Sequence, residues 1–521
     1  MKKRYLSLLV LIPLLTSCGG NNGPVAQFVD EDYTPVLPEF KNKNNGAIKE
    51  DDNYVYFDFY ETSDFHGAVT YDKDAKELGI ERLSKYFDEK RTANAGGTFV
   101  LSSGDMFQGT ADSNVTRGNL VTYSMNVMNY DAMCLGNHEF DWSVKWLQNN
   151  INRATFPFLC ANLQEKATSQ IPSFVKPYTI IERKTANNTV YKVGIVGSID
   201  EAVKDSILAS AITDYKFVNE IETVKTYAQQ MRSEGCDVIV WNTHHDVKDL
   251  KVKIASNTPD VDVIFGGHTH STILEEFNGI PMLESKDLGR SIPHVQLKVS
   301  KTDKTVEKVV AENDENPTSK EYSPDSDITG IFNQYKDRWI NPVKNQGLGR
   351  ADGDLRASEE LPNFAVESMI KATQAHIAEH TEITQYDIKA AFTNISGGVR
   401  DDIKGGNVSY GDVYKAFPFD NEIVVCKTNG QKLNSLASAA SSNNVAMYRT
   451  FTERFKNSDE VYFITSDYLA TAEDKLMPFV KEIVYQSKLY IRDVVADAIR
   501  NKGTVKASEY KTSANIAFQN L

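Results

Sequence analysis

The chain has 521 residues, too many for a single hydrophobic core, so at least two domains are expected. Its composition, with 41% hydrophobic and 25% charged residues, is that of a globular protein rather than of a disordered or fibrous one. The formal net charge of −14 argues against binding of a nucleic acid polymer, which requires basic surfaces, but a metal ion could still attract an anionic substrate.

Residues 1–18 have the pattern of a secretion signal. A basic KKR segment precedes the apolar run LSLLVLIPLL, which is too short for a transmembrane helix. The segment ends in LTSC and resembles the lipobox of bacterial lipoproteins, which implies cleavage before Cys18 and lipid attachment there. A plain signal peptide is the alternative. Residues 19–52 then form a glycine-rich tether, and the protein is expected in the bacterial cell envelope outside the cytoplasm, on the periplasmic face or the cell surface.

Residues 53–310 alternate short apolar, β-rich runs with helical patterns. The strand-like runs lie in VYFDFYETSDFHG, GTFVLSSGD, YDAMCLGNHEFD, CDVIVWNTHH and VDVIFGGHTH, and helices are expected near 78–91, 118–129 and 216–233. This alternation predicts α/β layering, with the strands buried on both faces.

A polar segment interrupts this pattern after residue 310. Residues 311–326, AENDENPTSKEYSPDS, contain two prolines and indicate a linker, and the helical spacing that follows extends the connection to residue 345. Residues 346–521 are expected to form a second α/β or α+β domain.

Polar side chains follow the strand-like runs of the first domain. They are Asp64 and His66, Asp105, Asn137, His138 and Asp141, His244 and His245, and His268 and His270, and they include six of the nine histidines. Because ligands bind at the carboxyl ends of strands in open α/β sheets, these side chains are expected to form one site. Carboxylate, imidazole and amide oxygen ligands favour divalent Zn, Mn or Fe. Two ions bridged by one aspartate would clamp a phosphoryl group and lower the pKa of a bridging water molecule.

The motifs that contain these residues resemble those of a known family. DxH at 64–66, GD at 104–105, GNHEFD at 136–141, TH at 243–244 and GHTH at 267–270 are similar to the motif set of the calcineurin-like metallophosphoesterases. The flanking words VLSSGDMFQGT and LGNHEFDW are most similar to the 5′-nucleotidase branch. The resemblance implies a four-layer α/β/β/α metallophosphoesterase sandwich, followed by a second α/β (α+β) substrate-specificity domain.

The resemblance also implies roles for individual residues. It implies one divalent ion held by Asp64, His66, Asp105 and His270, and a second held by Asp105, Asn137, His244 and His268. His138 matches the residue that stabilises the transition state, and Asp141 matches the carboxylate that orients it and favours its protonated form. Glu139 receives no role.

Two further groups of polar residues lie outside this assignment. His245 and Asp246 stand where the family usually has an apolar residue and a glycine, so they either line the substrate approach or belong to a solvated loop. HIAEH at 376–380 fits the H-x-x-E-H pattern of zinc proteases, but its polar flanks favour an exposed helix end.

The second domain resembles the substrate-specificity domain of 5′-nucleotidases. Gly397, Gly398 and Arg400 match a glycine–arginine turn, in which the backbone approaches the ligand and the arginine holds phosphate. Phe419 and Tyr468 match two aromatic residues that stack on the base.

Other positions of this domain match the family less well. Asp474 matches the aspartate that binds the ribose hydroxyls, but the loop around it reads AEDKL instead of the usual GGDGF. The family's asparagine falls on Ile395, with Asn394 one place early, and Arg356 is the nearest candidate for a further phosphate-binding arginine. The usual PFGN or PFGG word is PFDN here, with Asp420 in place of a glycine.

These observations predict a lipid-anchored, two-metal phosphohydrolase that releases phosphate from nucleoside 5′-monophosphates. Hydrolysis of UDP-sugars or of 2′,3′-cyclic nucleotides is an alternative within the same architecture. The altered loop motivates a second alternative, a phosphoesterase that acts on substrates other than nucleotides. A surface binding lipoprotein without catalysis is a third, and the intact set of ligand residues argues against it.

Overall fold

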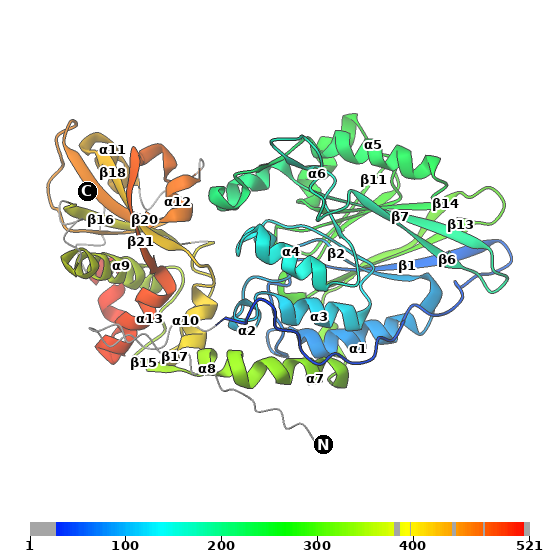
Figure 1. Ribbon diagram of the computed structural model, residues 1–521, viewed down its shortest axis with the longest axis horizontal. Coiled ribbons are helices and arrows are strands. Elements are labelled where there is room, and N and C mark those ends of the chain that lie inside the picture. The colour runs from blue at the N-terminus through cyan, green and yellow to red at the C-terminus, as the bar shows by residue number, and fades with distance from the viewer. Residues whose placement is uncertain (1–27, 380–385, 396, 440–443, 473–474, 515–521) are drawn as a thin grey trace, which may run out of the picture.

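The computed structural model describes residues 28–379, 386–395, 397–439, 444–472 and 475–514. These residues form two lobes that lie side by side, with the N-terminal lobe on the right in Figure 1 and the C-terminal lobe on the left. A helical segment runs along the lower edge of this view and joins them.

The N-terminal lobe contains two six-stranded sheets. The strands of the first sheet, in spatial order, are β14 (Val306–Asp314), β13 (Ile292–Ser300), β1 (Tyr54–Thr62), β2 (Thr98–Ser102), β3 (Ala132–Cys134) and β4 (Phe158–Leu159). Those of the second are β11 (Ile273–Phe277), β12 (Ile280–Glu284), β10 (Val263–Gly266), β9 (Val238–His244), β7 (Val190–Ile199) and β6 (Tyr178–Lys184). A small pair, β5 (Leu163–Glu165) and β8 (Tyr215–Phe217), lies apart from both sheets.

The central strands of both sheets run parallel. β1, β2, β3 and β4 pair in parallel in the first sheet, and β7, β9, β10 and β12 do so in the second. Strands that are buried on both faces need no alternation of polar and apolar residues, as the fully buried TFVLS of β2 illustrates. Parallel strands place their carboxyl ends along one edge, and this edge faces the C-terminal lobe (Figure 1).

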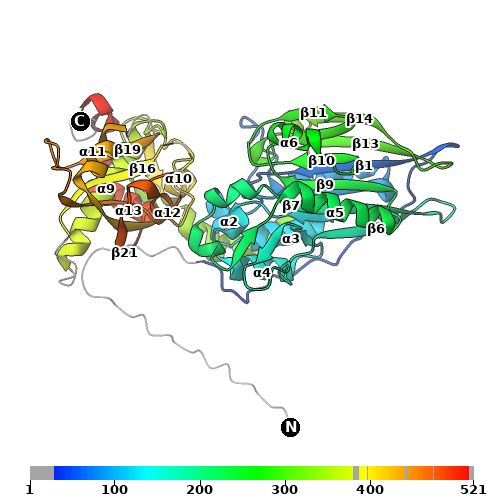
Figure 2. The same ribbon diagram turned by 90° about the horizontal axis from the view of Figure 1, so that it is seen from above.

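Helices cover the outer face of each sheet. The first sheet packs against α1 (Gly79–Arg91), α3 (Asn119–Met128) and α4 (Val144–Arg153), and the second against α5 (Glu220–Ser233) and α6 (Val247–Lys253). The layers are seen from a second direction in Figure 2. The predicted α/β/β/α sandwich is therefore confirmed.

The expected helices near 78–91 and 118–129 correspond to α1 and α3. The expected helix near 216–233 begins later, at Glu220, because residues 215–217 pair as β8 instead. The Asn219 side chain accepts a hydrogen bond from the backbone N–H of Glu222, and this cap sets the start of α5.

The connection between the lobes is more ordered than a polar linker. β14 continues to Asp314 and pairs with β13, so the strand extends into the segment expected to be linker. After it come α7 (Ser326–Tyr335), a π-helical turn (Lys336–Ile340) and α8 (Asn341–Lys344). Trp339 is completely buried, and its ring meets that of Tyr33 edge-on with centroids 4.4 Å apart. This packing fixes the connecting helices to the N-terminal lobe.

The C-terminal lobe is built on a five-stranded mixed sheet. In spatial order its strands are β19 (Val445–Arg449), β16 (Ile388–Asn394), β20 (Glu460–Ser466), β18 (Glu422–Asn429) and β21 (Glu482–Tyr490). α9 (Glu360–Glu379) and α13 (Ile491–Lys502) pack on one side and α11 (Gly430–Ala439) on the other. A three-stranded sheet of β17 (Gly406–Ser409), β15 (Gly347–Ala351) and β22 (Thr504–Val505) completes the lobe, with the short helices α10 (Tyr410–Ala416) and α12 (Asp467–Thr471).

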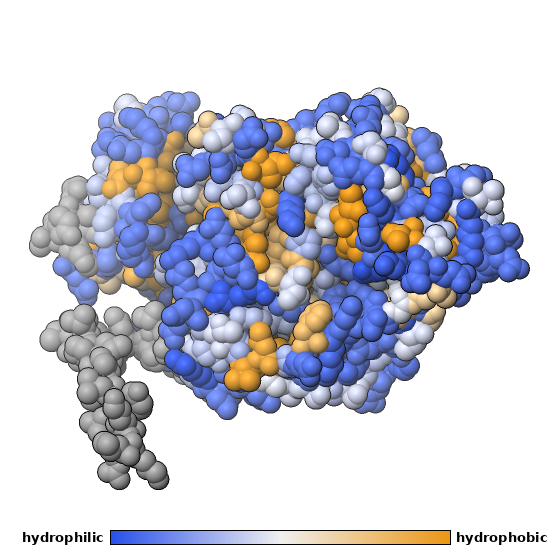
Figure 3. Space-filling view, turned by 45° about the vertical axis from the view of Figure 1, so that its right-hand side comes forward, coloured by the Kyte–Doolittle hydropathy of each residue, from blue (hydrophilic) through white to orange (hydrophobic). Residues whose placement is uncertain are grey.

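The outer surface is mainly hydrophilic on the face drawn in Figure 3, with hydrophobic residues in separate patches. No helix within the described ranges is both long enough and apolar enough to cross a bilayer.

An aromatic and aliphatic core holds the two sheets together, and a substitution at Phe99 tests its contribution to stability. Its side chain is fully buried, stacks on Phe59 at 5.2 Å between ring centroids and lies 6.3 Å from the ring of Phe57. We expect Phe99→Ala to lower the free energy of unfolding by about 3–5 kcal/mol, because it removes apolar contacts and leaves a cavity. Urea denaturation measures this change.

Val252→Ala is the matched control, since Val252 is 75% exposed and its truncation should change stability by less than about 0.5 kcal/mol. Equal effects of the two substitutions would contradict the tightly packed interface between the sheets.

Candidate active site

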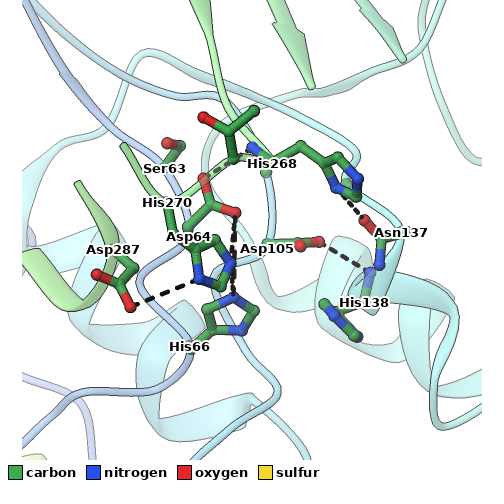
Figure 4. Close-up of polar contacts among 12 residues, drawn as sticks. Ser63, Asp64, His66, Asp105, Asn137, His138, His268, His270 and Asp287 are labelled. Carbon is green, nitrogen blue, oxygen red and sulfur yellow. Dashed lines mark hydrogen bonds and ion pairs between the residues drawn. The ribbon is translucent and has the colours of Figure 1, made fainter. Parts of the chain in front are cut away.

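Seven metal-ligand candidates converge on one edge of the sandwich from both sheets. Asp64 and His66 follow β1, Asp105 follows β2 and Asn137 follows β3 in the first sheet. His244 ends β9, and His268 and His270 follow β10, in the second sheet. The close-up in Figure 4 shows Asp105 between two groups of these side chains. The sequence motifs are thus brought together as expected, at the carboxyl ends of the strands.

The first group contains Asp64, His66 and His270. The Nε2 atoms of the two rings face each other at 3.1 Å, and His270 Nε2 lies 3.4 Å from Asp64 Oδ1. Asp64 Oδ1 is buried and receives no hydrogen bond from the described part of the chain. A buried carboxylate oxygen beside two ring nitrogens has the donor set of a divalent cation site, and the three ligand atoms lie close enough together to share one ion.

The second group contains Asp105, His244 and His268, with the Asn137 amide between the two rings. His244 Nε2 lies 3.2 Å from Asp105 Oδ2. Asn137 Oδ1 lies 3.2 Å from His244 Nε2 and 3.0 Å from His268 Nδ1. Asp105, His244 and His268 again bring ligand atoms within reach of one ion. Both groups therefore fit divalent metals.

Backbone carbonyl groups fix the orientation of two ligand rings. His66 Nδ1 donates to the carbonyl oxygen of Gln108 at 2.8 Å, and His244 Nδ1 donates to that of Ser103 at 2.7 Å. A carbonyl oxygen can only accept, so the proton sits on Nδ1 and Nε2 is directed into the site.

Burial sets the charge of the ligands. It lowers the pKa of His66 to about 3 and that of His268 to about 4, with neighbouring histidines adding to each shift, so both rings are neutral at pH 7. Burial also disfavours the Asp64 carboxylate, but the His270 and His244 rings outweigh it and lower the pKa of Asp64. Burial lowers the pKa of His244, yet the Asp105 and Asp64 carboxylates raise it to about 10 overall. A divalent cation would replace that proton.

Five of the candidate ligand residues have a left-handed backbone. Their φ angles are +50° at Asp64, +48° at His66, +54° at Asp105, +87° at His268 and +57° at His270. Such conformations cost about 1–3 kcal/mol each for residues other than glycine and persist only where the surrounding structure imposes them. With these conformations, each loop turns sharply enough to direct its side chain back into the site.

Glu139, which received no role from the sequence, holds two ligand loops together. Its carboxylate accepts hydrogen bonds from the backbone N–H groups of Gly136 at 2.7 Å, Asp105 at 2.8 Å and Met106 at 3.0 Å. Burial and the nearby Asp105 carboxylate raise the pKa of Glu139 to about 7. The motif GNHEFD contains Glu139, but the sequence does not show that its carboxylate would bind the backbone of residues 105 and 106, which lie far away along the chain.

Glu284 supports the histidine loop of the second sheet in the same way. Its Oε1 accepts a hydrogen bond from the backbone N–H of Thr269 at 2.9 Å, and Thr269 lies between His268 and His270. Burial raises the pKa of Glu284 to about 8.

His138 lies beside the two groups of candidate metal ligands and belongs to neither. Its backbone N–H donates to Asp105 Oδ1 at 2.8 Å, while its ring Nδ1 lies 2.8 Å from Asp141 Oδ2. Burial lowers the pKa of His138, but the Asp141 and Asp105 carboxylates outweigh it and raise the pKa overall. The pairing of His138 and Asp141 expected from the sequence is thus present.

The C-terminal lobe completes a cavity of about 400 Å³ over these groups. It is lined by Asp105, Asn137, His138, Asp141, His268 and His270 from one lobe, and by Asn394, Gly397, Gly398, Arg400, Phe419 and Tyr468 from the other. Arg400 Nη2 lies 3.5 Å from His138 Nε2, and the Phe419 ring stacks on the His138 ring with centroids 5.4 Å apart. A Cβ atom at Gly398 would lie 2.0 Å from Asn394 Oδ1, so a side chain at position 398 would displace the Asn394 amide.

Several residues singled out in the sequence lie elsewhere. Arg356 is not among the described residues that line the cavity, because Glu359 and Glu360 bind its guanidinium group at the start of α9. Asp474 lies outside the described residues. Trp142 and Lys475, which the sequence did not suggest, do line the cavity.

His245 neither lines the cavity nor belongs to a solvated loop. It is buried, with Nδ1 2.6 Å from Glu220 Oε2 and Nε2 2.9 Å from Asp249 Oδ2. His376 of the HIAEH segment lies on α9, where its Nε2 bonds the Tyr485 hydroxyl at 2.9 Å, and His380 lies outside the described residues.

Comparison with known families agrees with this geometry. Residues 57–272 match the model of the calcineurin-like phosphoesterases, and residues 343–452 match that of the 5′-nucleotidase C-terminal domain. The first match contains every proposed metal ligand, and the second contains Arg400 and Phe419.

Individual proteins resemble the chain over different lengths. Endonuclease YhcR of Bacillus subtilis is 24% identical over 72% of this chain, which spans only 32% of that protein. Protein UshA of Yersinia enterocolitica is 25% identical over 74% of this chain and 76% of its own length. The crystal structure of a 5′-nucleotidase precursor from Thermus thermophilus superposes with a TM-score of 0.69 at 20% identity, covering 86% of this chain and 97% of that one, which shows a shared fold.

A substitution at Gly136 tests how closely the loop after β3 must approach the loop that carries Asp105. A Cβ atom there would lie 2.2 Å from Asp105 Oδ1 and 2.7 Å from the Asp105 backbone nitrogen. We expect Gly136→Ala to displace Asp105 and weaken metal binding about 10–100-fold, as loss of a ligand-orienting contact does. Metal content after dialysis, measured by mass spectrometry, checks this.

Gly330→Ala is the control, because a Cβ atom at Gly330 meets no atom within 4 Å. Full metal content in the Gly136→Ala protein would contradict the geometry described for the Asp105 loop.

Proposed function

Since the chain belongs to the calcineurin-like phosphoesterases and carries a 5′-nucleotidase C-terminal domain, we propose that it hydrolyses nucleoside 5′-monophosphates to nucleosides and phosphate. The observation that carries this proposal is the cavity that members of both metal groups, His138 and the glycine–arginine turn line together. In this proposal residues 53–310 form the catalytic domain, residues 311–345 the connection and residues 346–521 the substrate-binding domain.

The two ligand groups divide the metals between them. Asp64, His66 and His270 would hold one divalent ion and Asn137, His244 and His268 the other, with Asp105 shared. When bound, the ions supply positive charge for the phosphoryl oxygens and an activated water molecule. The ligand types suit Zn, Mn or Fe.

His138 and Arg400 supply the protein's own charge to the phosphoryl group. The Asp141 carboxylate holds the imidazole through Nδ1, which leaves Nε2 directed into the cavity to donate a hydrogen bond to the substrate. Arg400 reaches the same place from the other lobe. Donors fixed in advance around the developing negative charge stabilise the transition state more than the ground state.

The remainder of the cavity suits a nucleoside. Phe419 and Tyr468 offer aromatic faces for a base, and the cavity volume lies within the range of small-molecule sites. Asn394 and the glycine turn place polar backbone and amide groups beside Arg400, where a phosphate could bind.

A panel of substrates tests the proposal. We expect the protein, supplied with Mn or Zn, to release phosphate from AMP and UMP at least about tenfold more efficiently than from p-nitrophenyl phosphate, because both lobes contact a nucleotide. UDP-glucose and 2′,3′-cyclic AMP complete the panel. His138→Ala should lower the catalytic constant about 10²–10⁴-fold, the range for loss of a proton donor, and a chelator should abolish turnover.

His376→Ala is the control, since His376 lies on α9 outside the cavity. Equal rates on all phosphoesters would contradict nucleotide specificity and favour the alternative of substrates other than nucleotides. A preference for UDP-glucose or for 2′,3′-cyclic AMP would assign that compound, instead of the nucleoside monophosphate, as the substrate. Metal binding without any turnover would favour a binding lipoprotein.

We further propose that the protein is anchored to the bacterial cell envelope through lipid on Cys18, outside the cytoplasm. The LTSC sequence supports this assignment. Labelled palmitate should be incorporated into the wild-type protein and not into Cys18→Ala, which should move from the membrane fraction to the soluble fraction. Membrane attachment of the Cys18→Ala protein would contradict a lipid anchor at this position.

A further inference from the structure

The loop at Pro418–Asn421 contains an acidic residue, Asp420, that binds arginines from both lobes. Arg117 Nη1, from the segment between α2 (Ala111–Asn114) and α3, lies 2.8 Å from Asp420 Oδ2. Arg492 Nη2, from α13 of the C-terminal lobe, lies 2.7 Å from Asp420 Oδ1. Each oxygen of the Asp420 carboxylate therefore binds an arginine from a different lobe.

The three charged groups are largely shielded from water. Their side chains are 12% exposed at Arg117, 22% at Asp420 and 2% at Arg492. Burial raises the pKa of Asp420, but Arg492 and Arg117 outweigh it and lower the pKa, so the carboxylate is charged. Ion pairs in such surroundings are screened by salt much less than pairs on the surface.

Further contacts fix the backbone of the same loop. The Asn114 side chain of the N-terminal lobe donates to the carbonyl oxygen of Pro418 at 2.8 Å. Arg492 Nη1 donates to the carbonyl oxygen of Phe419 at 3.4 Å. The loop is thus held by side chains of both lobes immediately before and after Phe419.

This loop forms one wall of the cavity. Phe419 stacks on His138 with the ring planes inclined by 27°. Arg117, which binds Asp420, also lies over the Trp142 ring at 5.4 Å, and Trp142 follows Asp141 in the chain. Arg117 therefore contacts both the loop that carries Phe419 and the loop that carries the His138 partner.

We propose that Asp420 is a positioning residue that clasps the two lobes together through Arg117 and Arg492 and so sets Phe419 against His138. The clasp acts on substrates that both lobes must hold, such as nucleotides, and little on small phosphoesters that need only the metal groups. In this respect it rests on the nucleotide function proposed above. Its effect on the arrangement of the lobes is independent of any substrate.

Arg117→Gln is the cleanest variant for a test. It removes the ion pair between the lobes, together with the stacking of the guanidinium on Phe28 and Trp142 within the N-terminal lobe, and leaves the Asp420–Arg492 pair intact. Asp420→Asn, by contrast, also deprives the buried Arg492 of its carboxylate. The double variant completes a cycle that isolates the Arg117–Asp420 interaction. Asp354→Asn is the matched control, because Asp354 forms an exposed pair with Lys404 at 3.5 Å within the C-terminal lobe.

Two measurements on the metal-loaded protein decide the proposal. Small-angle X-ray scattering should show a larger radius of gyration for Arg117→Gln and Asp420→Asn than for wild type and Asp354→Asn. In Arg117→Gln, the KM for AMP should rise about tenfold more than the KM for p-nitrophenyl phosphate. A tenfold change lies within the range of interaction energies measured for coupled charge pairs. Adding Arg117→Gln to Asp420→Asn should change neither quantity further.

A radius of gyration and a KM for AMP that match wild type in a folded Arg117→Gln protein would overturn the clasp. Equal rises in KM for AMP and p-nitrophenyl phosphate would also overturn it, because they indicate damage to the metal site. If the wild type hydrolyses no nucleotide, the proposed function fails, and the scattering comparison alone supports or overturns the clasp. If Asp420→Asn unfolds, Arg117→Gln decides.

Discussion

Two aspartates and several imidazoles are buried together at the edge where the two sheets meet, and this electrostatic constraint shapes the rest of the molecule. Buried carboxylates at close range repel each other and lose their hydration, so the arrangement is stable only with compensating positive charge. Asp64 and Asp105 are almost completely buried, and in the described part of the chain the positive charge nearest to them comes from histidine rings. Divalent cations are the natural complement to this edge, and paired divalent cations in turn bind and polarise phosphoryl groups.

The fold supports this edge through its backbone. Short loops after buried parallel strands turn back sharply, at the cost of left-handed conformations at residues such as Asp105 and His268. Buried glutamates then accept hydrogen bonds from backbone N–H groups of these loops, Glu139 between two loops of the first sheet and Glu284 on the histidine loop of the second. The ligands are therefore preorganised by hydrogen bonds that reach across strands.

The second lobe meets this edge at the cavity that residues of both lobes line. Arg400 and Phe419 both approach His138 from the C-terminal lobe. In the proposed function, the position of that lobe would determine which phosphoesters reach the metal ions. The connecting helices, packed on the N-terminal lobe through Trp339, and the Asp420 contact with Arg117 both help to hold it in place.

The fold class, the convergence of the candidate ligand residues and the contact of His138 with Asp141 could all be predicted from the sequence, because each depends on a short motif placed directly after a buried strand. Features that depend on distant partners were misjudged: the start of α5, which β8 displaces, and His245, which Glu220 draws into the interior. Glu139 received no role, and Arg356 was suggested although neighbouring glutamates bind its guanidinium group. Only the tertiary structure shows these points and the contact of Phe419 with His138. The spacing of residues in a motif determines which edge of the sheet a side chain reaches, but it does not determine which residues from distant parts of the chain contact that side chain there.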